Sequence, residues 1–254
     1  MLDLLSTELF LASAIILLGA YLNGAFGFGM GMLSAPMLVL VNPIFVPGPV
    51  LISGLLVTVF GVIRDRAALD LRGAGWALAG RVPGTMLGAA TVAALSGPWL
   101  GLAISSSVLI AVVMGTLGYV PKRTSGSLFA AGAVSGLFAT LAAVGGPPMV
   151  LIWQSAPAIQ RRAALALFFL VGTFMSLAAL LIVGAIDRRV LLVSLALAPT
   201  CIAGFALGAY GPRLRREKAI RTAALALCAM AGLALFYRSL DMLLTSSTTA
   251  QFLQ

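Results

Sequence analysis

Long apolar runs occupy most of the chain, and their lengths constrain its fold more than any other feature. The eight longer runs cover residues 9–28, 50–63, 73–95, 99–119, 128–144, 163–184, 190–210 and 220–237, and two short ones cover 31–41 and 148–156. At 1.5 Å per residue, short runs of eleven and nine residues cannot cross about 30 Å of hydrocarbon. The chain is 61% hydrophobic and 9% charged, which is more apolar than a soluble protein of 254 residues. We therefore expect an all-α integral membrane protein with about eight transmembrane helices and two short broken or re-entrant segments.

The first long run and the first short run are separated by glycines. The segment from Asn23 to Pro36 contains glycine at positions 24, 27, 29 and 31. Since each interior glycine costs a helix about 1 kcal/mol against alanine, we predict that the helix unwinds between about Phe26 and Gly31. Pro36 is expected in or near the first turn of the helix that follows.

A second break repeats the first one 112 residues further along the chain. This offset places Pro36 on Pro148, and Gly145-Gly146-Pro147 then marks the second interruption. Paired breaks at matching places in two halves of a membrane protein indicate a substrate site near the bilayer midplane.

The basic residues predict the orientation of the chain in the membrane. Twelve of the sixteen lie in four connections and are Arg64, Arg66, Arg72, Lys122, Arg123, Arg161, Arg162, Arg213, Arg215, Arg216, Lys218 and Arg221. If each short run returns the chain to the side it came from, all four connections lie in the cytoplasm. Both termini are then periplasmic, and the chain is a multi-pass protein of the cytoplasmic (inner) membrane.

This orientation divides the chain into two transmembrane repeats. Residues 1–121 form the first repeat, residues 126–240 form a second, inverted repeat, and residues 241–254 form a polar C-terminal tail. Each half also contains a Gly-x-x-x-Gly pair, at Gly84 and Gly88 and at Gly204 and Gly208. We expect these pairs at close helix crossings.

The start of each short helix is a candidate anion site. Unpaired backbone N–H groups and the positive end of the helix dipole bind anions there, and glycine lets an oxyanion approach the backbone closely. We expect the substrate-binding residues to be Asn23, Gly27, Gly29, Gly31, Ser34, Pro36, Thr140, Gly145, Gly146, Pro147 and Pro148. The alternative is that the glycines only allow helices to pack closely.

Arg81 is a charged residue well inside a predicted span, and no carboxylate in that span can pair with it. An arginine in the bilayer costs at least about 2.5 kcal/mol, so such a residue is a functional candidate. An anionic substrate would supply the missing partner, and a sulfonate or sulfite could do so with two oxygens. The alternatives are a side chain that reaches to the cytoplasmic edge and one that bonds to carbonyls of a broken helix.

The two glycine and proline patches, together with the layout of the spans, resemble the TauE/SafE (TSUP) family of sulfite exporters. The residues that carry the resemblance are Gly27-Phe-Gly-Met-Gly-Met-Leu-Ser-Ala-Pro36 and Gly145-Gly-Pro-Pro148. The resemblance implies a transporter, and not an enzyme, for sulfite, organosulfonates or related small anions.

The composition also bears on the partners, the cofactors and the direction of transport. The net charge of +9 is explained by the basic connections, so no nucleic-acid partner is expected. The absence of histidine and of a cysteine cluster argues against haem and structural zinc, and no cofactor is expected. Export of an anion across the membrane is favoured by an inside-negative potential. The alternative function is import of an organic sulfonate or a related carboxylate, which would need a coupling ion, either sodium or a proton. A membrane-embedded enzyme and an assembly subunit are remote alternatives, and a homodimer is left open.

Overall fold

The computed structural model describes residues 2–27, 29–68, 71–116, 122–211 and 217–251, and the regular elements that they form are helices. The long helices are α1 (Leu2–Phe26), α3 (Gly48–Asp65), α4 (Leu71–Ala94), α5 (Gly97–Thr116), α6 (Ser125–Ala142), α8 (Ala158–Ile182), α9 (Arg188–Tyr210) and α10 (Glu217–Gln251). The short ones are α2 (Met30–Val41) and α7 (Gly146–Trp153), and 3₁₀ turns cover Pro43–Phe45 and Arg66–Ala68. The predicted set of long and short helices is confirmed.

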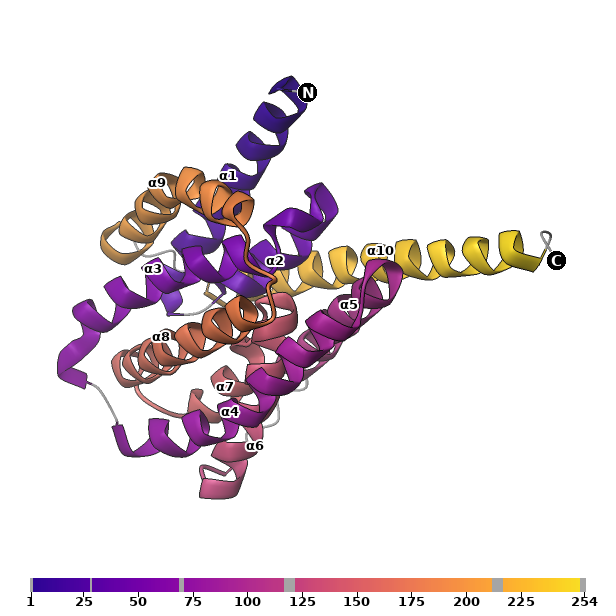
Figure 1. Ribbon diagram of the computed structural model, residues 1–254. Coiled ribbons are helices and arrows are strands. Elements are labelled where there is room, and N and C mark those ends of the chain that lie inside the picture. Colours follow the sequence, from indigo (N-terminus) through magenta and orange to yellow (C-terminus); the bar gives the residue numbers. More distant parts are fainter. Residues whose placement is uncertain (1, 28, 69–70, 117–121, 212–216, 252–254) are drawn as a thin grey trace.

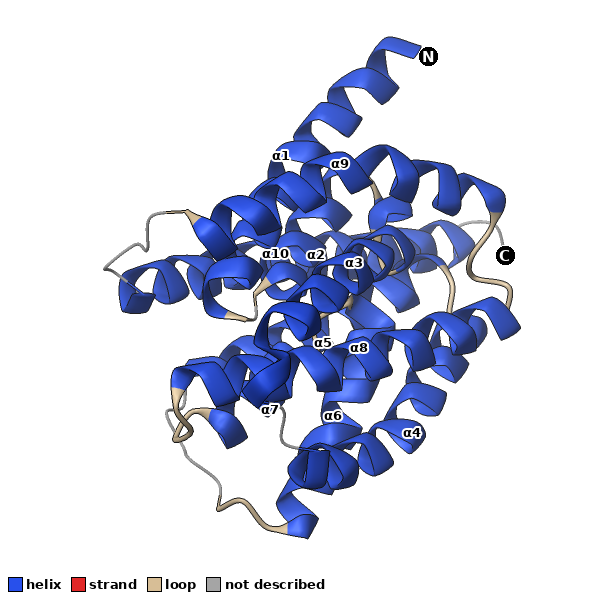
Figure 2. Cartoon of the chain, turned by 90° about the vertical axis from the view of Figure 1, so that its left-hand side faces the viewer, coloured by secondary structure: helices blue, strands red, loops and turns tan. Residues whose placement is uncertain are grey.

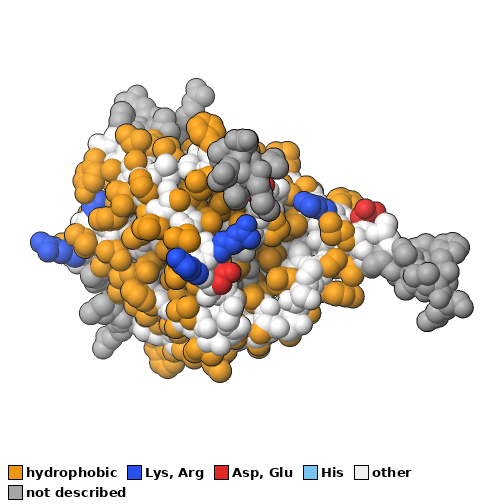
Figure 3. All heavy atoms as spheres, turned by 45° about the horizontal axis from the view of Figure 1, so that its top comes forward, with side chains coloured by type: hydrophobic (Ala, Val, Ile, Leu, Met, Phe, Trp, Pro, Cys, Tyr) orange, Lys and Arg blue, Asp and Glu red, His pale blue; other side chains and the backbone are white. Residues whose placement is uncertain are grey.

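Seven segments within the described residues are long and apolar enough to cross a membrane. These segments are Thr7–Phe26, Pro43–Ala68, Gly97–Thr116, Ser125–Ala142, Ala158–Ile182, Arg188–Tyr210 and Leu225–Thr245. The outer surface agrees with this assignment, because apolar side chains cover most of the face in Figure 3. Phe10, Leu195 and Ile182 are 74%, 71% and 85% exposed, which suits contact with lipid and not with water.

The two halves of the chain form matching sets of helix contacts (Figures 1 and 2). Exchanging α1–α5 for α6–α10 in order converts the contact of α4 with α6 into that of α9 with α1. The same exchange converts the contact of α4 with α8 into that of α9 with α3, and that of α2 with α10 into that of α7 with α5. It leaves the pairs α3–α8 and α5–α10 unchanged. The described helices of the two halves therefore pair in the same pattern.

Close crossings occur at the two predicted glycine pairs. A side chain on Gly84 of α4 would collide with the Ala133 carbonyl of α6, and one on Gly204 of α9 would collide with the Leu17 carbonyl of α1. Gly88 and Gly208 face the same two partner helices. These contacts confirm the close crossings, because only a residue without a side chain lets the backbones approach this far.

Three of the basic connections lie at one end of the bundle. The Arg162 side chain at the start of α8 bonds Asp65 at the end of α3, and Arg123 before α6 stacks on Trp153 at the end of α7, 5.4 Å from the ring centroid. The end of α9 lies there as well, since Gly24 of α1 contacts both Phe205 and Ala209. Residues 117–121, with the predicted repeat boundary, and Arg213, Arg215 and Arg216 lie outside the described residues.

Two expectations about helix positions need correction. Pro36 does not lie in the first turn of α2, because α2 resumes at Met30 directly after Gly29 and Pro36 is its seventh residue. The second short helix begins at Gly146, two residues before the expected start at Pro148, and ends at Trp153. In addition, α10 continues as a helix to Gln251, through most of the predicted tail.

Candidate functional site

The first break, between α1 and α2, is made by glycine torsion angles. Gly27 has φ = 83° and Gly29 has φ = 113°, and L-residues with side chains rarely adopt such angles. Gly29 caps α2, and its carbonyl accepts the first helical hydrogen bond from Leu33 N–H (2.9 Å). The N–H groups of Met30, Gly31 and Met32 therefore have no acceptor within α2, so this helix start can offer three amides to a ligand.

The second break, between α6 and α7, is made differently. Ala143 ends α6 in the left-handed conformation (φ = 56°), and its N–H donates to the Ala139 carbonyl (2.8 Å). The Ser135 hydroxyl donates to the Gly145 carbonyl at 2.6 Å and thus ties the break to α6. Pro147 and Pro148 follow in the first turn of α7 and have no N–H, so Gly146 is the one N–H donor among the first three residues of this helix.

The two breaks meet in the interior of the bundle. A side chain on Gly31 would collide with the carbonyl of Ala143, so the backbones of the two breaks are in direct contact there. A cavity of about 60 Å³ opens beside this contact. Its lining residues are Asn23, Gly29, Met30, Gly31, Met32, Val50, Leu51, Gly54, Thr58, Arg81, Ala139, Ala143, Gly145, Gly146, Phe169 and Thr173. Such a cavity has room for several waters.

Arg81 of α4 brings a positive charge to this cavity. Its side chain is 0% exposed, and its Nε and Nη1 atoms have no hydrogen-bond partner among the described residues. Its guanidinium carbon lies 4.8 Å from the Phe168 ring centroid and 6.0 Å from that of Phe169. Ring faces attract the cation but accept no strong hydrogen bond. Arg81 is therefore buried, and at least two of its nitrogen atoms are unsatisfied, which a protein tolerates only at a considerable cost.

Two glycines make room for the Arg81 side chain. A side chain on Gly172 of α8 would occupy the space of the Arg81 guanidinium, and one on Gly136 of α6 would lie 3.0 Å from the Arg81 Cγ atom. The guanidinium is thus held between α6 and α8 and does not reach towards the membrane surface. This position contradicts the alternative in which Arg81 extends to the cytoplasmic edge.

Six of the twelve predicted site residues line the cavity, and the other six lie elsewhere. The six in the lining are Asn23, Gly29, Gly31, Arg81, Gly145 and Gly146. Gly27 packs against Arg162, and Pro36, Pro147 and Pro148 belong to the short helices themselves. The Ser34 hydroxyl donates to the Ile15 carbonyl (3.3 Å), and that of Thr140 donates to Gly136 (2.9 Å) and contacts Ser176. The Ser34 hydroxyl therefore joins α2 to α1, and the Thr140 hydroxyl joins α6 to α8.

Sequence reasoning missed the contributions of α3 and α8. Thr58 of α3 and Thr173 of α8 belong to the lining, and Gly172 provides the space for Arg81. Nothing in the apolar runs distinguishes these residues from ordinary small residues of a helix interface. The described residues contain no group of three or more His, Cys, Asp or Glu side chains that could hold a metal ion.

One comparison with known proteins gives a match. The family model described as sulfite exporter TauE/SafE matches residues 11–235 of the chain. No curated protein and no solved structure matches the chain. The matched region contains both helix breaks, Arg81 and every residue of the cavity lining.

Proposed function

The chain belongs to the TauE/SafE family of sulfite exporters and is a multi-pass membrane transporter, and from this premise we propose that it binds a small sulfur oxyanion in the cavity beside Arg81. The substrate is sulfite or a small organosulfonate. Transport runs outward across the cytoplasmic membrane, from the side of the basic connections.

The observation that carries this proposal is the unsatisfied guanidinium of Arg81. Two buried nitrogen atoms without a partner require an acceptor, and an oxyanion provides two oxygens at the spacing of a guanidinium edge. The amides of Met30, Gly31, Met32 and Gly146 add neutral donors and the positive ends of two helix dipoles. A neutral or cationic solute would leave Arg81 unpaired, so this site favours anions.

The proposed direction follows from electrostatics. Moving one negative charge out of an inside-negative cell gains about 2.3 kcal/mol per 100 mV, so export needs no coupling ion. An importer of the same anion would need sodium or a proton, and the described cavity lining contains no carboxylate to carry the proton. The matching helix contacts of the two halves support an inverted repeat, in which one arrangement opens outward and its counterpart opens inward.

The test is the concentration dependence of sulfite and methanesulfonate flux in proteoliposomes. Arg81→Lys keeps the charge but loses the planar pair of donors, so the half-saturation concentration should rise by about 5- to 150-fold, which corresponds to 1–3 kcal/mol. Arg81→Gln should lose more. Arg66→Lys is the matched control because Arg66 is exposed and outside the cavity, and its flux should equal that of the parent. Parent-like kinetics in Arg81→Lys would remove Arg81 from the site.

A further inference from the structure

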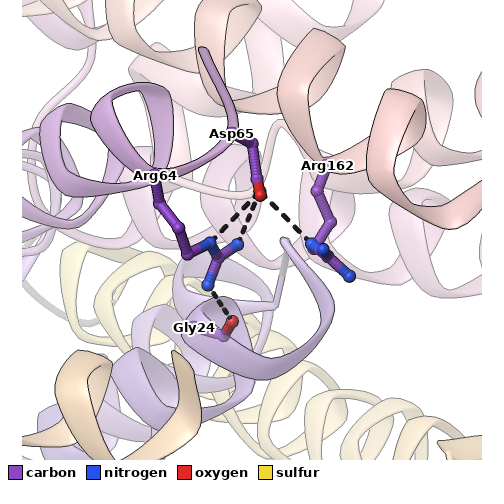
Figure 4. Close-up of polar contacts among 4 residues, drawn as sticks. All are labelled: Gly24, Arg64, Asp65 and Arg162. Carbon is purple, nitrogen blue, oxygen red and sulfur yellow. Dashed lines mark hydrogen bonds and ion pairs between the residues drawn. The ribbon is translucent and has the colours of Figure 1, made fainter. Parts of the chain in front are cut away.

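A second group of arginines lies at the basic end of the bundle, and Figure 4 shows how Arg64 and Arg162 meet Asp65. Asp65 Oδ2 accepts hydrogen bonds from Arg64 Nε (3.2 Å), Arg64 Nη2 (2.8 Å) and Arg162 Nε (3.2 Å). Arg64 Nη1 also donates to the Gly24 carbonyl at 2.6 Å. The three side chains are only 16%, 5% and 17% exposed for Arg64, Asp65 and Arg162. We call Arg64, Asp65 and Arg162 the gate cluster.

The gate cluster is attached to helices that line the cavity. Asp65 follows Thr58 by seven residues on α3, and Arg162 precedes Phe169 by seven residues on α8, which is about 10 Å along each helix. On α1, Gly24 is next to Asn23 of the lining, and Gly27 of the first break packs against Arg162. The cluster therefore joins α1, α3 and α8 about two helical turns from the cavity.

In the gate cluster, two arginines surround one carboxylate, as they would surround a bound anion. Two guanidiniums share one carboxylate, so the group carries a net charge of +1, and a single oxygen atom of Asp65 accepts from both arginines. A sulfonate or sulfite also offers oxygens with a negative charge to guanidinium groups. Separating the helices would leave two poorly exposed arginines without a counter-ion, which is unfavourable unless another anion takes the place of Asp65.

We propose that Arg64 and Arg162 form a second, transient oxyanion site at which the Asp65 carboxylate holds the place of the transported anion. An oxyanion arriving from the basic end displaces Asp65 from the two arginines, which loosens the contact between α3 and α8 and opens the way to Arg81. Cations and neutral solutes cannot replace the carboxylate, so the gate cluster selects for anions before the cavity does. This inference rests on the proposed function, because its ligand is the transported oxyanion.

The binding site is tested without transport, by thermal unfolding of purified protein with methanesulfonate in a gluconate buffer. The Arg81→Gln background removes the anion site of the cavity, so any remaining stabilisation reports on the gate cluster. In Arg81→Gln/Asp65→Asn the competing carboxylate is gone, and methanesulfonate should raise the melting temperature with a midpoint at least about tenfold below that of Arg81→Gln alone. Adding Arg162→Gln should abolish the effect, whereas adding Arg66→Gln should not change it.

Flux gives a second measurement that does not depend on the double variant. Asp65→Asn alone should lower the half-saturation concentration for methanesulfonate added on the side of the basic connections, because the substrate no longer competes with Asp65. An Asp65 that only ties α3 to α8 predicts another result, namely lower thermal stability with unchanged half-saturation and no stabilisation by the anion. That result would overturn the second site.

The two proposals fail separately. If Arg81→Gln alone leaves anion binding and flux unchanged, the cavity proposal fails, whatever the gate cluster does. If Arg81 variants raise the half-saturation concentration but Asp65→Asn gives no anion-dependent stabilisation and no change in half-saturation, the cavity proposal stands and the second site is refuted.

Discussion

The two helix breaks hold matching places in the two halves, but they are built from different chemistry. The first break uses two glycines with positive φ, and each of the first three residues of α2 has an N–H without an acceptor inside that helix. The second uses an alanine in the left-handed conformation and two prolines, so only one of the first three residues of α7 has an N–H. Two helix breaks at matching places in the chain therefore need not provide the same set of hydrogen-bond donors.

Arg81 adds a second difference between the breaks. Its side chain lies against Gly136 of α6, next to Ser135, whose hydroxyl bonds the Gly145 carbonyl of the second break. Arg81 thus packs on the helix that leads into the second break. Three substitutions test the difference between the two breaks.

The largest effect is expected where the breaks touch. In Gly31→Ala the new methyl group would collide with the Ala143 carbonyl, and neither backbone can move without the other. We expect a loss of about 1–3 kcal/mol in the free energy of unfolding, together with loss of flux. Thermal unfolding in detergent measures the first and proteoliposome flux the second. Gly75→Ala, on an exposed part of α4 where nothing lies within 4 Å, is the control. It should keep the flux of the parent and unfold with a free energy equal to or up to about 1 kcal/mol above that of the parent, because alanine favours a helix over glycine.

A smaller effect on stability but a clear effect on transport is expected at Gly146. Nothing lies within 4 Å of a side chain added there, and this residue lines the cavity. Gly146→Ala should therefore unfold within about 0.5 kcal/mol of the parent but raise the half-saturation concentration for methanesulfonate, because the methyl group stands beside the N–H group of residue 146. An equal loss of stability in Gly31→Ala and Gly146→Ala would contradict the distinction between a packed and an open break.

The smallest effect is expected from returning an amide to the second break. Pro147→Ala adds an N–H in the first turn of α7, where Pro147 now provides none. One added neutral hydrogen bond is worth about 0.5–1.5 kcal/mol, so the half-saturation concentration should fall by about two- to tenfold. A value identical to the parent, with α7 intact by circular dichroism, would show that the number of amides does not limit binding at this break.

The sequence alone determined the class of fold and the places where helices break. Apolar runs of about 20 residues must be helices in lipid, because only a helix satisfies its own backbone hydrogen bonds there. Glycine and proline act on the backbone locally, so the break at residues 27–29 and the start of the second short helix could be located to within about two residues. The exception was Pro36, which a helix interior accommodates in α2.

The tertiary structure decided which of the candidate residues face one cavity. Ser34 and Thr140 are polar residues near the breaks, as Asn23 is, but the side on which each points depends on the rotation of its helix against α1, α6 and α8. Thr58, Thr173 and Gly172 reach the site from helices distant in sequence, and their roles depend on where α3 and α8 cross. Local propensity sets where a helix begins and ends, whereas packing between helices sets which side chains meet, and an apolar run in lipid gives no hydrophobic pattern from which that packing could be read.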